Sequence, residues 1–175
     1  MNREDAFYYE NLLVLGFSDE YDRWLNSFLE KEDPLNDITL DLACCGSDYN
    51  KTIAVLMKYR MEQQVDEASV CNRLRRYLKK AFESQQMDKW QVVSAMYTIA
   101  SHIGDPGDFD PGTWEDMFYM EYYYSLAEDG ILAWESFDSA FFAYLYNGIP
   151  LDSEKIWGNR KKPTLLERIK RFLKL

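Results

Sequence analysis

The chain has 175 residues, of which 47% are hydrophobic and 16% aromatic, and its formal net charge at pH 7 is −10. This composition excludes an intrinsically disordered protein, because such chains lack the apolar surface that offsets conformational entropy. No run of 18 apolar residues occurs, so no membrane span is predicted. The negative charge argues against a protein that binds nucleic acid by neutralising phosphates.

The first part of the chain shows helical periodicity and no targeting signal. Its start, MNRED, lacks the apolar core of a signal peptide. Apolar residues then recur with the spacing that places one stripe along a helix. This stripe consists of Tyr21, Trp24, Leu25, Phe28 and Leu29.

The next helix is predicted to start at Asp33-Pro34, where an N-cap residue precedes a proline in the first helical position. It runs into Cys44 and Cys45 in an apolar stretch, so both thiols are expected in a buried helix. Together with Cys71 they are interpreted as reduced structural cysteines, which favours a cytoplasmic location.

The middle of the chain predicts two long amphipathic helices. The first carries a basic patch, Arg73 to Lys80, which we interpret as a solvated helix face. Asp88 and Gln91 have the spacing of a capping box at the start of the second. The apolar stripe of this second helix consists of Trp90, Val93, Tyr97, Ala100 and Ile103.

The stretch GDPGDFDPG at 104–112 contains two prolines and three glycines and is predicted to be an irregular loop. Thr113 is expected to cap the helix that follows. The fold class predicted from these patterns is all-α, a single-domain bundle or short irregular α-solenoid of about eight or nine antiparallel helices. The predicted helices are 4–15, 19–31, 35–45, 48–62, 66–86, 88–103, 113–128, 133–147 and 163–174.

Charge divides the chain into two predicted parts. Residues 160–175 have seven basic and one acidic side chain, a net charge of +6, which leaves −16 for residues 1–159. We therefore expect an acidic helical domain at 1–159 and a basic amphipathic helix at 160–175. Such a helix can lie on an anionic membrane, but the acidic domain beside it favours docking on the protein's own surface.

The candidate site is an acidic loop followed by an aromatic helix. Carboxylates in this pattern suit a solvated turn, a protein contact or a hard cation, but the EF-hand spacing fails because the glycine position is Thr113. A helix that is apolar on all sides is buried or covered by a partner, and some of its tyrosines must face outward. The predicted partner-binding residues are Asp105, Asp108, Asp110, Glu115, Asp116, Tyr119, Tyr122 and Tyr123.

Catalysis has little support in the sequence. His102 is the one histidine, and no glycine-rich phosphate loop, GxSxG or HExxH motif occurs. We therefore expect no enzyme activity, no cofactor and no bound metal.

The acidic, motif-free helical body resembles immunity proteins of bacterial polymorphic-toxin and contact-dependent inhibition systems. The segment that carries this resemblance is 15–52, LGFSDEYDRWLNSFLEKEDPLNDITLDLACCGSDYNKT. The resemblance implies a cognate toxin, often a basic nuclease, that is neutralised by direct binding. It transfers no individual site residue to this sequence.

Three other functions fit the same sequence. The chain could be a helical-repeat scaffold for an unknown partner, a phage or mobile-element protein that blocks a nucleic-acid enzyme by charge mimicry, or an enzyme that uses carboxylates and a metal. The function expected here is a non-catalytic binding module for a protein partner, with the oligomeric state left open.

Overall fold

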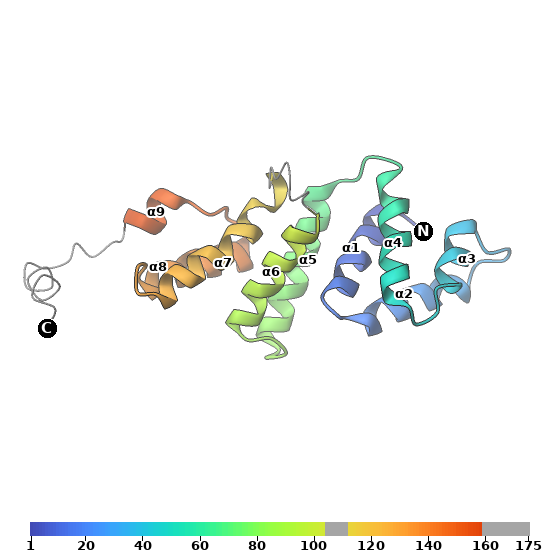
Figure 1. Cartoon of the computed structure of the whole chain (residues 1–175), viewed down its shortest axis with the longest axis horizontal. Helices are drawn as coiled ribbons and strands as arrows, with labels where there is room; N and C mark the ends of the chain where they lie inside the picture. Colours follow the sequence, from blue (N-terminus) through green and yellow to red (C-terminus); the bar gives the residue numbers. More distant parts are fainter. Residues whose placement is uncertain (104–111, 159–175) are drawn as a thin grey trace, which may run out of the picture.

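The computed structural model describes residues 1–103 and 112–158, and within these ranges it confirms the predicted all-α class, without strands. The helices pack side by side in an elongated row (Figure 1). Their bounds are α1 Arg3–Val14, α2 Ser18–Leu29, α3 Asp37–Ala43, α4 Tyr49–Met61, α5 Glu67–Glu83, α6 Lys89–Ile103, the 3₁₀ turn η1 Gly112–Trp114, α7 Glu115–Glu128, α8 Trp134–Asn147 and α9 Ser153–Gly158.

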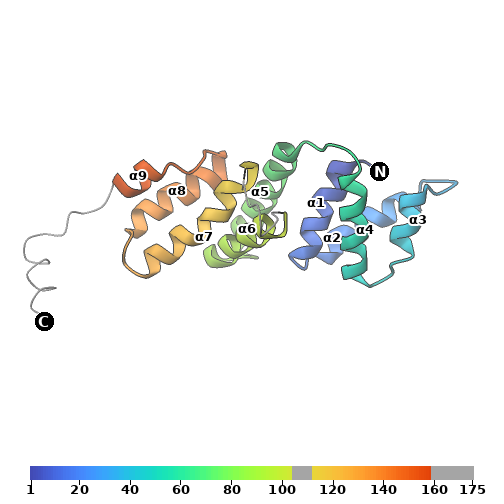
Figure 2. The same ribbon diagram turned by 45° about the horizontal axis from the view of Figure 1, so that its top comes forward.

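The row has three parts that follow the order of the sequence. Helices α1 to α4 form one end, the antiparallel pair α5 and α6 lies in the middle, and α7 to α9 form the other end, as the second view confirms (Figure 2). The short connections predicted this antiparallel arrangement, because two consecutive helices joined by a short loop pack side by side and run in opposite directions.

The buried apolar residues form two clusters that share helix α1. Phe7 and Leu12 of α1 belong to a main cluster with residues of α5 to α8. Ala6 and Leu13 of the same helix belong to an N-terminal cluster with residues of α2, α3 and α4. Helix α1 therefore has two apolar sides, one packed against α2 to α4 and the other against the rest of the row.

Several predicted boundaries are confirmed and others are wrong. Asp88 and Gln91 form the capping box, since each side chain accepts the other's backbone N–H at 2.8 Å. Helix α3 begins later than predicted, because the side chain of Asn36, and not Asp33, accepts a helix N–H, that of Thr39. Thr113 does not cap α7, because it lies inside the preceding 3₁₀ turn.

The prediction missed the last described helix, and two predicted segments are not tested by the structure. Helix α9 was not predicted, although Asp152 caps it by accepting the N–H of Lys155 at 3.1 Å. The predicted loop 104–112 falls almost entirely, and the predicted helix 163–174 entirely, outside the residues that the structure describes. The docking of the tail 160–175 therefore remains a prediction.

Two burial predictions are wrong. Cys44 is exposed, whereas Cys45 and Cys71 are buried as expected. The reason is that the short helix α3 lies at the end of the row, where only one of its faces packs against other helices. In α6, Trp90 and Tyr97 are 42% and 37% exposed. Val93 and Ala100 of the predicted stripe are buried, and the rest of the buried face of α6 consists of Val92, Ala95, Met96 and Ile99.

The basic patch on α5 is only partly a solvated face. Arg76 is exposed, as predicted. Arg73 instead pairs with Asp5 of α1, and Arg75 donates a hydrogen bond of 2.7 Å to the carbonyl of Leu145 near the end of α8. A cation at this position also interacts favourably with the negative end of the α8 dipole, so two of the basic residues join helices.

In the described part of the chain no helix combines the length and apolarity that crossing a bilayer requires.

Candidate functional site

The five predicted site residues that the structure describes line one pocket. The pocket has a volume of about 550 Å³ and lies between the start of α7 and the segment that leads into α9. The other three predicted residues, in the loop before η1, lie outside the described residues. The predicted residues that meet in the pocket are Glu115, Asp116, Tyr119, Tyr122 and Tyr123.

The spacing of these residues on α7 explains why they share one face. Residues three, four or seven positions apart lie above one another on a helix, which applies to Glu115, Tyr119 and Tyr122. The opposite face of α7 carries Met117 and Met120, which are fully buried in the main cluster. The helix therefore turns these two methionines to the core, and two carboxylates and three of its tyrosines to the pocket.

The second wall of the pocket comes from Pro150, Leu151 and Ser153, which sequence analysis missed. Asp116 holds this wall in place, because its Oδ1 accepts the backbone N–H of Leu151 at 2.8 Å. Burial raises the pKa of the Asp116 carboxyl above its usual value, while this hydrogen bond acts in the opposite direction. The signal that could have revealed this wall is the capping aspartate, Asp152.

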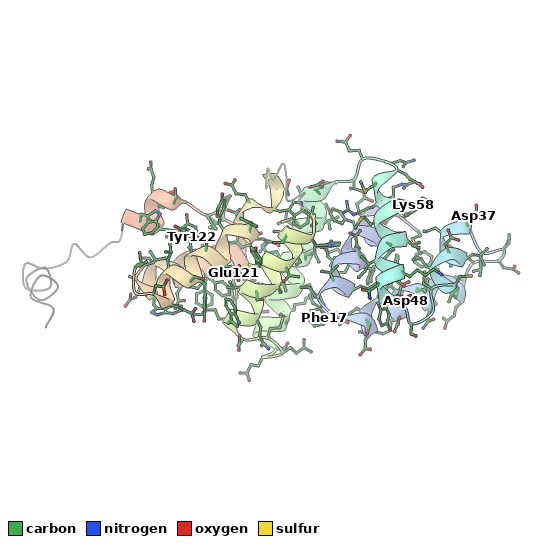
Figure 3. All side chains as sticks on the ribbon, in the orientation of Figure 1. Phe17, Asp37, Asp48, Lys58, Glu121 and Tyr122 are labelled. Atoms are coloured by element: carbon green, nitrogen blue, oxygen red, sulfur yellow. The ribbon has the colours of Figure 1, made fainter. Side chains whose placement is uncertain are left out.

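Two of the three pocket tyrosines are exposed. Tyr119 and Tyr122 are 40% and 53% exposed, which confirms that part of the aromatic run faces outward. Figure 3 labels Tyr122 on the side of α7 toward α9. Deeper in the pocket, Tyr123 packs edge-on against Trp157 of α9, with 6.4 Å between the ring centroids, and burial raises its pKa.

The electrostatics of this end of the molecule favour a cation. Residues 112–158 contain nine acidic residues and one basic residue, Lys155, which is already paired with Asp152 at 2.9 Å. Neither Glu115 nor Asp116 forms a salt bridge within the described ranges. Their two charges exceed the partial positive charge of about half a unit at the N-terminus of α7.

The arrangement therefore suits a side chain of lysine or arginine. Carboxylates attract the charge, and the faces of tyrosine rings attract cations as well. No group of three potential metal ligands occurs among the residues that the structure describes.

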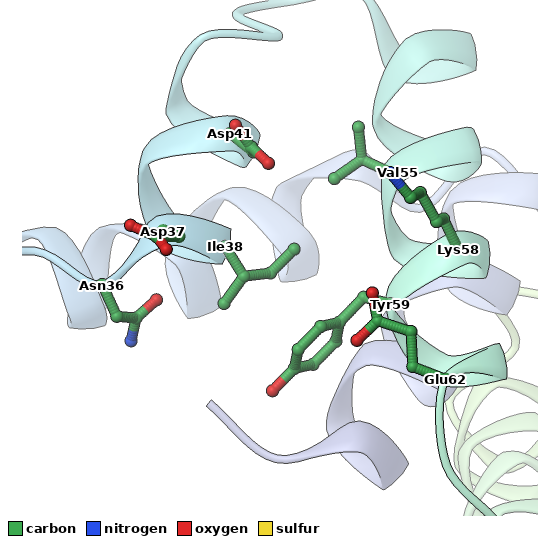
Figure 4. A pocket seen from close by; sticks show the side chains of 8 residues that line it. All are labelled: Asn36, Asp37, Ile38, Asp41, Val55, Lys58, Tyr59 and Glu62. Carbon is green, nitrogen blue, oxygen red and sulfur yellow. The ribbon is translucent and has the colours of Figure 1, made fainter.

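A second cavity, of about 560 Å³, lies between α3 and α4 (Figure 4). It also has carboxylates at its rim, but Lys58 lies among them and only one tyrosine, Tyr59, lines it. The hydroxyl of Tyr59 is engaged, because it donates to the carbonyl of Met1 at 3.0 Å. The side chains shown are Asn36, Asp37, Ile38, Asp41, Val55, Lys58, Tyr59 and Glu62.

A buried charged cluster joins three helices and was missed by sequence analysis. Glu10 of α1 has no exposed surface. Its carboxylate accepts a 2.7 Å hydrogen bond from Nε of Arg60 in α4 and lies 2.8 Å from Nε2 of His102 in α6. The histidine considered for catalysis is thus engaged in a structural contact, and sequence spacing could not reveal it because its partner lies 92 positions away.

No protein-family model, curated protein or solved structure matches this chain.

Proposed function

We propose that the protein is a non-catalytic binding module that neutralises a basic protein, such as a toxin or nuclease, and that the pocket on α7 receives a lysine or arginine side chain of that partner. We call this pocket, lined by Glu115, Asp116, Tyr119, Tyr122 and Tyr123, the tyrosine–carboxylate pocket.

The observation that carries the proposal is the meeting of two carboxylates and three tyrosines in one cavity without a salt-bridge partner in the described structure. Residues that anchor protein complexes are enriched in tyrosine and sit in pockets. An acidic surface also accelerates association with a basic partner through electrostatic steering. Neutralisation by binding needs no catalytic group.

A defined cationic probe tests the pocket directly. We would titrate the full-length protein with a labelled nona-arginine peptide and follow fluorescence anisotropy. Glu115→Lys and Tyr122→Ala are each expected to weaken binding about tenfold, equivalent to about 1.4 kcal/mol. Both side chains are exposed, so circular dichroism should show unchanged helicity.

The chain offers a matched control for this charge reversal. Asp41 is also an exposed carboxylate at the rim of a cavity, the one between α3 and α4. Asp41→Lys changes the net charge as much as Glu115→Lys does, and it should leave the affinity for the peptide within about twofold, because exposed charges far apart are screened from each other. Equal effects of the two reversals would remove the tyrosine–carboxylate pocket from the proposal.

The natural partner is tested by capture from a lysate of the source organism, at low and high salt, with identification by mass spectrometry. Wild-type protein should retain a stoichiometric basic protein, and the double variant Glu115→Lys, Tyr122→Ala should lose it. If the partner is a toxin, its gene is expected beside this one, and deletion of this gene should make that toxin lethal. A neutral partner, or one retained by the double variant, would contradict the proposal.

The elongated row of helices favours a second candidate function, a scaffold for an unknown partner. Packed helix pairs in a row provide an extended surface, as in α-solenoid proteins. A scaffold would bind its partner along several helices, so the pocket substitutions on α7 alone would leave most of the affinity.

A further inference from the structure

We infer that the tyrosine–carboxylate pocket also binds a segment of this chain itself, the basic residues Arg160, Lys161 and Lys162. They would occupy the site where the proposed partner binds, so that the partner has to displace them. The docking depends on the geometry and charges described above, and only the competition rests on the proposed function.

Chain connectivity brings this segment to the pocket. Helix α9 begins at Ser153, which lines the pocket, and its six residues extend for about 9 Å. Near its end, the ring of Trp157 contacts Tyr123, another pocket residue. The helix therefore runs beside the pocket, and Arg160 follows Trp157 by three residues.

The length of the chain after α9 limits how far each basic residue can lie from the end of the helix. An extended chain spans up to about 3.5 Å per residue, so the four residues after Gly158 cover up to about 14 Å. Counted from Gly158, Arg160 lies within about 7 Å and Lys162 within about 14 Å, so the segment begins beside the part of the pocket that Tyr123 forms.

Charge complementarity supports this occupant. Residues 160–162 are three consecutive basic side chains, and residues 112–158 have a net charge of −8. On α5, Arg73 and Arg75 are engaged elsewhere, because they contact α1 and α8. Lys155, the basic residue within 112–158, is paired with Asp152.

Tethering makes even a weak contact effective. A short flexible connection gives an effective concentration in the millimolar range. An intrinsic dissociation constant of about 1 mM would then keep the pocket roughly half occupied.

Zero-length cross-linking of the full-length protein tests the docking. A carbodiimide joins a carboxylate to an amine only when the two are in contact. Mass spectrometry is expected to find Glu115 or Asp116 linked to Lys161 or Lys162, with a yield that falls at high salt. A mixture of isotopically light and heavy chains separates links within one chain from links between chains. Absence of these intramolecular links, while the pair Lys155 and Asp152 does link, would overturn the inference.

Two charge-matched variants test the competition. Arg160→Glu, Lys161→Glu, Lys162→Glu should bind the nona-arginine peptide about twofold more tightly than wild type, because the tethered competitor is removed. The control Arg168→Glu, Lys170→Glu, Arg171→Glu changes the charge equally, and it should bind with an affinity close to that of wild type. Equal tightening by both variants would overturn the assignment to residues 160–162.

The two measurements separate this inference from the proposed function. Cross-links without any peptide binding would support the docking and contradict the proposed function. Peptide binding that depends on Glu115, without cross-links, would support the proposed function and overturn the docking.

Discussion

Glu10 is a carboxylate in a fully buried position between three helices. Removing one partner of a buried ion pair leaves the other charge uncompensated, so Glu10→Ala is expected to destabilise the protein by about 3–5 kcal/mol. Glu62 offers a comparison, because it pairs with Arg3 at 3.2 Å but its side chain is 55% exposed. Glu62→Ala should cost less than about 1 kcal/mol. Urea denaturation measures both, and equal losses would contradict this interpretation of Glu10.

Asp116 predicts a pH dependence of stability with a definite sign. Burial raises the pKa of this carboxyl in the folded state, so folding favours its protonated form. The resulting contribution to stability is complete below the unfolded-state pKa and is lost as the pH rises through the folded-state pKa. Wild type should therefore gain stability relative to Asp116→Asn as the pH is lowered from 7 toward 3.

Thermal or urea unfolding at several pH values checks this slope. Asparagine at position 116 keeps an oxygen that can accept the N–H of Leu151. Asp116→Ala loses this acceptor and should be less stable than Asp116→Asn at every pH. A slope of the opposite sign would show that the hydrogen bond from Leu151 outweighs burial.

At the scale of one element, helix α8 ends at Gly148 in a left-handed conformation, with φ of +67°. Alanine there costs about 1–2 kcal/mol for the backbone alone. A Cβ would also lie 3.2 Å from the guanidinium of Arg75, which donates to the last turn of α8. Gly148→Ala is therefore expected to destabilise the protein by more than this backbone cost.

Gly130 isolates this extra cost, because it has the same φ of +67° and open space where its Cβ would be. The loss of stability in Gly148→Ala should exceed that in Gly130→Ala by about 1 kcal/mol, the value of one hydrogen bond. Chemical denaturation of both variants checks the difference. Equal losses would mean that Arg75 moves aside without losing its contacts.

At the scale of the whole molecule, helix α1 couples the two hydrophobic clusters. Its residues pack into both, and Glu10 binds α4 and α6 at the same time. We expect the two ends to unfold together. In native-state hydrogen exchange, the slowest amides of α4, near Leu56, and of α6, near Ile99, should report opening free energies that agree within about 1 kcal/mol. A much lower value in α4 would show that the N-terminal cluster unfolds first.

Local patterns were enough to predict most helices and half of the candidate site. The capping box of Asp88 and Gln91 and the common face of Glu115, Tyr119 and Tyr122 depend on residues three to seven positions apart. Periodicity and capping act over these distances, so they can be recognised in the sequence before the fold is known.

Tertiary structure decided which faces are covered. Cys44 is exposed and Glu10 is buried because of where α3 and α1 lie in the row of helices. The residues next to Cys44 and Glu10 in the sequence do not indicate this exposure. The second wall of the pocket comes from residues more than thirty positions after Asp116, held by the bond to Leu151. Contacts between distant segments depend on how all the helices pack together, and periodicity along a single helix contains no information about its neighbours.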